Sequence, residues 1–171
     1  MFHRSQGRAI LTGLIVLAVP LCLPKITRAD DKAECGAAWA DGYALQKKGD
    51  YPAAVKAYER ALELASRVFG VEDTNTVALL NNLAILYANM GQYAKAEPLY
   101  QRSLKIQEFQ LGPNHLEVAQ SLNGLAALYA NMSQYAKAEP LYQRSLKIQE
   151  SQLGPDHPDL ALGLSNLAVL Y

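Results

Sequence analysis

The side chains in this sequence that are best suited to binding chemistry are asparagines that recur at a fixed spacing. Asn81 and Asn123 are separated by 42 residues, and so are Asn89 and Asn131. A side-chain amide both donates and accepts hydrogen bonds, so a row of amides can pair with the backbone of an extended peptide. Asn89 and Asn131 can instead simply end a helix, because asparagine suits a C-terminal cap. The pattern therefore indicates peptide recognition by Asn81 and Asn123, whereas for Asn89 and Asn131 it favours a helix end, with peptide contact as the alternative.

Residue types that support catalysis or metal binding occur without the spacing that such sites require. His115 and His157 are also 42 residues apart, but no cysteine pair and no HExxH sequence accompanies them. We interpret both histidines as residues that start or pack helices, and carboxylates such as Glu59 and Glu63 as members of solvated helix faces. The sequence contains no glycine-rich phosphate loop and no nucleophile-elbow serine. It therefore predicts a protein that is not an enzyme and that has no metal, no cofactor and no small-molecule substrate.

These side chains belong to an internal repeat that covers most of the chain. The segments 86–108 and 128–150 differ at one position, where Ser133 replaces Gly91. In each unit, apolar residues at positions i, i+3, i+4 and i+7 predict an amphipathic helix. A short break and a second, longer helix follow. Tyrosines that recur at the same period are expected in the core, and small residues are expected where the two helices approach closely.

A repeat of this length predicts a stacked array of helical hairpins, in which each unit buries its apolar face against its neighbours. We place the units at residues 35–76, 77–118 and 119–160, and a partial fourth unit at 161–171. The predicted domain is all-α and spans residues 30–171. Because the partial unit has only its first half, we expect its leucines to lack partners. This predicts a fragment of a longer protein, or end-to-end self-association through 161–171.

Two sets of residues identify a known family. The first set is a pattern of leucine, small and aromatic residues in the second unit: Leu83, Ala84, Tyr87, Gly91, Tyr93, Ala96 and Tyr100. The runs NNLAxLY at 81–87, AEPLY at 96–100 and LGPDHP at 153–158 accompany them. The chain resembles the tetratricopeptide repeat over roughly residues 33–171, and in particular the long repeats of kinesin light chains and many bacterial arrays. The resemblance implies a right-handed α-solenoid that binds proteins or peptides.

The resemblance also implies which residues form the binding groove, because the first helix of each repeat lines the concave face and asparagines there often hold bound peptides. On this interpretation the groove is formed by Trp39, Tyr43, Lys47, Asn81, Asn82, Ile85, Asn89, Asn123, Ala127 and Asn131. Trp39 and Tyr43 are equally consistent with packing in the terminal unit. Lys47 favours an acidic residue at one end of the ligand. The expected partner is a protein or an extended peptide segment.

The distribution of charge argues against nucleic acid as a partner. Four of the sixteen basic residues precede residue 30 and no acidic residue does, which leaves twelve basic against sixteen acidic residues in the rest of the chain. Nucleic-acid binding needs a basic face. The predicted array is mildly acidic, so we expect no nucleic-acid partner.

Residues 1–29 have the features of a secretory signal peptide: a basic start, an apolar run at 9–23 and small residues at Thr27 and Ala29. We predict cleavage after Ala29 and export to the periplasm or the cell exterior. One alternative is an uncleaved membrane anchor at 9–23, although this run is shorter than the roughly 20 residues that span a bilayer. A lipid anchor on Cys22 is a further alternative.

Three roles for the array remain open at this point. The first is a binding scaffold that uses its concave groove. The second is the interaction arm of a longer protein whose catalytic or signalling domain lies outside this chain. The third is a structural repeat that assembles with itself.

Overall fold

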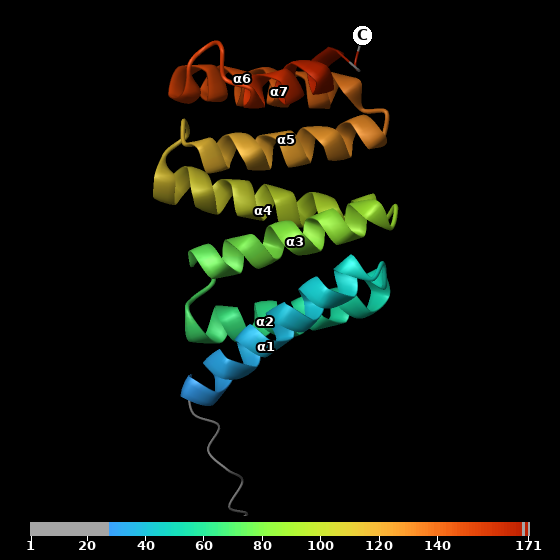
Figure 1. Cartoon of the computed structure of the whole chain (residues 1–171), viewed down its shortest axis with the longest axis vertical. Helices are drawn as coiled ribbons and strands as arrows, with labels where there is room; N and C mark the ends of the chain where they lie inside the picture. The colour runs from blue at the N-terminus through green and yellow to red at the C-terminus, as the bar shows by residue number, and fades with distance from the viewer. Residues whose placement is uncertain (1–27, 169, 171) are drawn as a thin grey trace, which may run out of the picture.

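The computed structural model describes residues 28–168 and residue 170, and every helix or strand assigned in this part of the chain is an α-helix. The helices are α1 (Arg28–Lys47), α2 (Tyr51–Val68), α3 (Thr74–Asn89), α4 (Tyr93–Leu111), α5 (Leu116–Asn131), α6 (Tyr135–Leu153) and α7 (Asp159–Ala168). Consecutive helices pack against each other throughout. Figure 1 shows the resulting stack, with α1 and α2 at one end of the long axis and α6 and α7 at the other. The predicted all-α solenoid of helical hairpins is confirmed.

The first hairpin differs from the predicted repeat in its proportions. The second helix has 19 residues and the first has 16 in both the second and the third hairpin. In the first hairpin α1 has 20 residues and α2 has 18, so the prediction of a longer second helix is wrong there. The reason is an extra turn at the start of α1, where the Arg28 guanidinium donates to the carbonyl oxygen of Val68 at 3.2 Å.

The predicted N-terminal segments lie almost entirely outside the described residues. Arg28 and Ala29 are described, as the first two residues of α1. The rest of the predicted signal peptide, including the apolar run at 9–23, is not. Within the described residues, no helix is both long enough and apolar enough to cross a membrane.

Helices α2, α3 and α5 begin where the sequence supplies a polar side chain for a free backbone N–H, whereas α4 and α6 have no such side-chain cap. The side chains of Asp50 and Asp73 accept from the backbone N–H groups of the residues three and two positions later. His115 performs the same role for α5, because its Nδ1 accepts from the backbone N–H of Glu117 at 3.2 Å. Such caps contribute about 0.5–2 kcal/mol each. The expected helix-start role of His115 is therefore confirmed.

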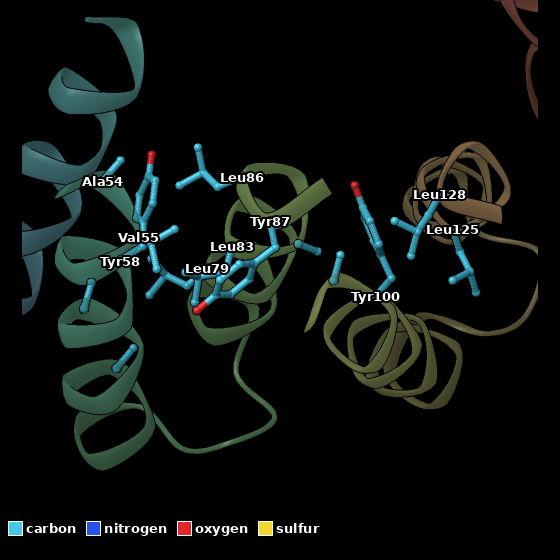
Figure 2. Close-up of a cluster of buried hydrophobic side chains, with 14 of the residues drawn as sticks. Ala54, Val55, Tyr58, Leu79, Leu83, Leu86, Tyr87, Tyr100, Leu125 and Leu128 are labelled. Carbon is cyan, nitrogen blue, oxygen red and sulfur yellow. The ribbon is translucent and has the colours of Figure 1, made fainter. Parts of the chain in front are cut away.

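The core consists of side chains that recur from hairpin to hairpin. Tyr58, Tyr100 and Tyr142 occupy the same repeat position and are 0%, 6% and 4% exposed. Figure 2 shows the ring of Tyr100 lying beside Leu125 and Leu128 of the next hairpin. The predicted tyrosine core is confirmed at these positions, whereas Tyr135 is half exposed and is not part of it.

Small residues allow the helices to approach, as predicted. Ala84, Ala96, Ala126 and Ala138 are completely buried. A Cβ added to Gly42 would lie 2.8 Å from the ring of Tyr58, which is closer than real side chains pack. The absence of a side chain at this position of α1 therefore allows α1 to pack directly on the tyrosine ring of α2.

Tyrosine hydroxyl groups join neighbouring hairpins. Tyr87 of α3 donates to a carboxylate oxygen of Glu59 on α2 at 2.6 Å, and Tyr129 of α5 donates to Glu97 on α4 at 2.8 Å. Burial and the adjacent carboxylate raise the pKa of Tyr87 to about 12. Glu59 is exposed, as expected of a solvated helix face, and it also accepts this hydrogen bond from the following hairpin.

Candidate peptide-binding face

The ten residues predicted to form the groove all lie on the odd-numbered helices. In the repeat register they form three columns across α1, α3 and α5, with Asn82 beside the first: Trp39, Asn81 and Asn123; Tyr43, Ile85 and Ala127; Lys47, Asn89 and Asn131. We call the solvent-facing side of these three helices, defined by these ten residues, the odd-helix face. Helices α3 and α5 also contact each other directly. The stack thus brings side chains that are far apart in the sequence onto one face.

The centre of the odd-helix face is apolar and its edge is polar. On α3, Asn82, Ile85 and Asn89 follow each other at the spacing of one helical stripe; Ile85 is 39% exposed and Asn89 is exposed. On α5, Ala127 is half-buried and Asn131 is exposed. Small apolar positions flanked by amides suit a ligand that is held by its backbone.

Asn89 and Asn131 stand at the ends of their helices, but neither has the left-handed backbone conformation that follows a helix end. Each is the last residue of its helix. The backbone conformation that reverses the chain falls two residues later, at Gly91 with φ of 70° and at Ser133 with φ of 57°. A left-handed conformation favours glycine. The left-handed conformation after each helix therefore falls on Gly91 and Ser133, and Asn89 and Asn131 are both exposed.

Asn81 differs from the other predicted amides because it takes part in the packing of the stack. Its Nδ2 donates to the Ser121 Oγ on α5 at 3.4 Å, and the Ser121 hydroxyl donates to Gln107 Oε1 on α4 at 2.5 Å. Three helices from two hairpins are joined in this way. The prediction from sequence missed this role. The sequence did contain a signal for it: Ser121 is polar at a position where the preceding unit has the apolar Leu79.

Asn123 lies beside open space. A hollow of about 370 Å³ is lined by Gln120 and Asn123 of α5, Gln149 of α6, and Pro158 and Leu162 near the start of α7. The Oδ1 atom of Asn123 is buried and has no hydrogen-bond partner among the described residues. Leu162 is 66% exposed at the rim of the hollow. The hollow therefore gives a ligand access to the surroundings of Asn123, whose Oδ1 atom shares its buried, unpartnered state with that of Asn81.

The two aromatic residues of α1 have different surroundings. Trp39 is half-buried and packs against the core, which favours the packing alternative for this residue. Tyr43 is 52% exposed. The Lys47 ammonium lies 4.6 Å from the centroid of the Tyr43 ring, as in a cation–π contact. Tyr43 and Lys47 thus form an exposed pair at one end of the odd-helix face.

Comparison with known proteins identifies the repeat. The family model of the tetratricopeptide repeat matches residues 37–108, 75–151 and 117–171. The chain belongs to the tetratricopeptide repeat family. Repeats of this family commonly mediate protein–protein interaction. No curated protein matches the chain.

Solved structures show the same tetratricopeptide fold. BtubC (BKLC) from P. vanneervenii is similar with a TM-score of 0.76 and 24% identity, over 83% of this chain and 57% of BtubC. The nearly identical repeats of a Podosopora anserina protein of the kinesin light chain type give a TM-score of 0.71 and 23% identity, over 85% and 67% of the two chains. The TPR domain of Arabidopsis FLU gives a TM-score of 0.63 and 18% identity, over 71% and 99%. At these identities the likeness concerns the fold, and this chain spans little more than half of BtubC.

Proposed function

We propose that this tetratricopeptide array is a non-enzymatic scaffold that holds an extended segment of another protein on its odd-helix face. The observation that supports this proposal is the set of exposed and half-buried amides and apolar side chains that recurs from α3 to α5. An extended backbone presents N–H and C=O groups alternately, and the amides of Asn82, Asn89 and Asn131 can pair with both. Ile85 and Ala127 offer apolar contacts for side chains of the segment.

The charge of the odd-helix face predicts a weak dependence of binding on salt. Among its ten residues Lys47 is the charged one. Salt screens exposed charges over about 8–10 Å at physiological concentrations, but it has little effect on amide and apolar contacts. Lys47, at the end of the face, adds a preference for an acidic residue at one end of the bound segment.

The proposal can be tested with an unfolded polypeptide as the probe, for example reduced and carboxymethylated lactalbumin. Replacing Ile85→Asp together with Ala127→Asp places two charges at the centre of the odd-helix face, and the affinity should fall at least about tenfold. Lys56→Glu is the matched control, because Lys56 is exposed on the even-numbered helix α2. Equal affinity of wild type and the double variant, with unchanged circular dichroism, would contradict binding on this face.

The amides of Asn81 and Asn123 need a separate test. Losing a buried amide pairing costs about 1–3 kcal/mol, so Asn81→Ala with Asn123→Ala should weaken binding at least tenfold, a factor of about 10 per 1.4 kcal/mol. Because Asn81 also donates to Ser121 within the stack, thermal unfolding must be measured on the same variant. The single variant Asn123→Ala separates ligand contact from stacking, since its hollow opens beside α7.

Association through α7 is a second candidate function. Leu162 and Leu164 of this helix are 66% and 53% exposed. Exposed leucines at an end of a stack favour docking of another helix, from a second copy or from a longer chain. Sedimentation at several concentrations tests self-association, and a monomer at every concentration contradicts it. The end of the open reading frame tests whether a further domain follows.

We also propose export of the array, on the basis of the basic start and apolar run before Ala29. N-terminal sequencing of the protein from its native host should find Asp30 as the first residue. An intact Met1 in a membrane-bound form would support the anchor at 9–23 instead.

A further inference from the structure

One arginine of the stack lacks the partner that its repeat equivalents have. Arg60, Arg102 and Arg144 occupy the same position of successive repeats. Arg60 forms an ion pair with Glu34 at 2.6 Å, and Arg144 forms one with Glu108 at 2.6 Å. In the part of the chain that the structure describes, Arg102 has neither an ion pair nor a hydrogen-bond partner. Its guanidinium is therefore free to bind an external group.

The sequence explains why Arg102 is free. The acid that pairs with Arg60 lies at position 34, and the equivalent position for Arg102 is Thr76. The acid that pairs with Arg144 lies at position 108, and the equivalent position for Arg102 is Ser66. Neither of these two residues carries a charge, so the repeat surrounding Arg102 supplies no acid from the positions that neutralise the other two arginines.

Arg102 lines a hollow with an apolar floor. The hollow measures about 430 Å³ and lies between α4 and the loop that connects α2 to α3; it is lined by Val71, Glu72, Arg102, Lys105, Ile106 and Phe109. Phe109 is 83% exposed and Val71 is 53% exposed. Large apolar side chains that stay exposed beside a hollow and near basic groups are typical of an interaction site.

The next repeat contains the same hollow without these features. It is lined by Asn114, Arg144, Lys147, Ile148 and Ser151, which are repeat equivalents of residues in the first hollow. Arg144 is neutralised there by Glu108 and also donates to the carbonyl oxygen of Pro113 at 3.0 Å. Ser151 stands in place of Phe109. Because α4 and α6 are otherwise nearly identical, the fold itself does not require a phenylalanine at this position.

We infer that the hollow between α4 and the α2–α3 loop is a docking surface for a protein segment in which an acidic side chain adjoins a large apolar one. The carboxylate pairs with Arg102, whose planar guanidinium can donate two parallel hydrogen bonds, and Lys105 adds a second positive charge. The apolar side chain enters beside Val71 and Phe109. This surface lies on an even-numbered helix, so it is separate from the odd-helix face and does not depend on the function proposed for that face.

Glu72 sets the orientation of the docked segment. Glu72 belongs to the loop that lines one side of the hollow, whereas Arg102 and Lys105 both lie on α4. A ligand carboxylate is attracted toward α4 and repelled from the loop. The acidic residue of the segment therefore lies over α4, and its apolar neighbour lies toward the loop.

The test uses the full chain labelled with ¹⁵N and an acetylated synthetic peptide, Gly-Ser-Asp-Phe-Asp-Leu-Ser-Gly. We expect saturable shifts of backbone amides at residues 71–72 and 102–109. The same peptide with asparagine in place of both aspartates should bind at least about tenfold more weakly, because it cannot form the charged pairs. An absence of saturable shifts, or shifts confined to the odd-helix face, would overturn the inference.

Substitutions at two exposed residues of the hollow test which contacts hold the peptide. Arg102→Glu should reduce affinity at least about tenfold and should allow binding of a peptide with lysine in place of the aspartates. Phe109→Ser converts the hollow to the form found in the next repeat and should also weaken binding. Lys147→Glu, in the equivalent hollow, is the matched control and should leave affinity unchanged. Unchanged affinity in Arg102→Glu, or an equal loss in Lys147→Glu, would contradict docking at this site.

Discussion

Two successive interfaces of this stack use second helices, α4 and α6, of nearly identical sequence, but their hydrogen bonding differs. Between the second and third hairpins, the Ser121 hydroxyl accepts from Asn81 and donates to Gln107. Between the third hairpin and α7, the equivalent of Ser121 is Gly163, which has no hydroxyl. The Oε1 atom of Gln149, the equivalent of Gln107, is buried there without a partner among the described residues.

The comparison shows that the free-energy cost of burying a polar side chain in one repeat depends on the residue that the next repeat places against it. Gln107 and Gln149 lie in helices of almost identical sequence, yet one accepts a hydrogen bond and the other does not. A buried polar atom without a partner costs about 1–3 kcal/mol. Because each hairpin contacts only its neighbours, one position on the following hairpin decides this cost.

The largest expected difference between the two interfaces concerns apolar burial. Leu122 of α5 is completely buried, whereas its equivalent Leu164 of α7 is 53% exposed. Leu122→Ala should lower the free energy of unfolding by about 2–5 kcal/mol, through lost burial and the cavity that remains. Leu164→Ala should change it by less than about 0.5 kcal/mol. Urea unfolding monitored by circular dichroism measures both, and similar losses would mean that α7 is buried in solution.

The second prediction concerns alkaline pH and the tyrosines that are buried in the hairpins. Buried tyrosines join the hairpins, and burial raises the pKa of Tyr87 and of Tyr100 to about 12 from the ordinary value of 10.0. A raised pKa in the folded state means that stability is fully present below about pH 10 and is lost as the pH rises toward 12.

We therefore expect the stack to unfold cooperatively in this pH range, with tyrosine ionisation, followed by ultraviolet difference absorbance, coinciding with the loss of helicity. Tyr87→Phe should shift the transition to higher pH, because it removes a hydroxyl that must ionise. Tyrosine ionisation completed near pH 10 in a folded chain would contradict this prediction.

The fold was predictable because its signals are local and periodic. The 42-residue period, the buried alanines such as Ala84 and Ala126, and the glycine at position 42 each describe contacts within or between adjacent helices of one repeat pattern. The starting residue of α1 was not predictable, because the bond that stabilises its first turn joins Arg28 to Val68, 40 residues away.

The candidate site was predictable only in part, for the same physical reason. The repeat register correctly places Asn81 and Ile85 on a first helix, but it does not show that the amide of Asn81 donates to Ser121 on the next hairpin. The unpaired guanidinium of Arg102 was missed because it depends on acids that are absent from positions 66 and 76. Periodicity reports what the repeats share, such as the hollow itself, whereas the unpaired arginine arises from a difference between them.

The third prediction removes the bridging hydroxyl of the complete interface. Ser121→Ala leaves Gln107 without its donor and should lower stability by about 1–3 kcal/mol. Ser151→Ala is the matched control, since the Ser151 hydroxyl donates to the Ile148 carbonyl within its own helix. Chemical unfolding of both variants measures the difference. An equal, small effect of the two substitutions would mean that the bridge contributes nothing to the stability of the stack.

The last prediction supplies the missing hydroxyl at the other interface. Gly163→Ser replaces a glycine inside α7 and should raise local stability by about 0.5 kcal/mol through helix propensity alone. A hydrogen bond from the new hydroxyl to Gln149 should add about 0.5–1.5 kcal/mol. The new Cβ would lie 3.2 Å from Gln149 Oε1 and 3.3 Å from a methyl carbon of Leu146, and both are ends of flexible side chains that can shift.

Gly163→Ala separates the two contributions, because it adds the Cβ without the hydroxyl. Alanine is the better helix former by about 0.5 kcal/mol, so on propensity alone the alanine variant should be the more stable of the two. If the hydroxyl completes the interface as Ser121 does, hydrogen exchange across residues 160–168 should instead be slower in the serine variant. Slower exchange in the alanine variant would show that Gln149 does not accept the bond, and that the difference between the two interfaces does not depend on the residue at position 163 alone.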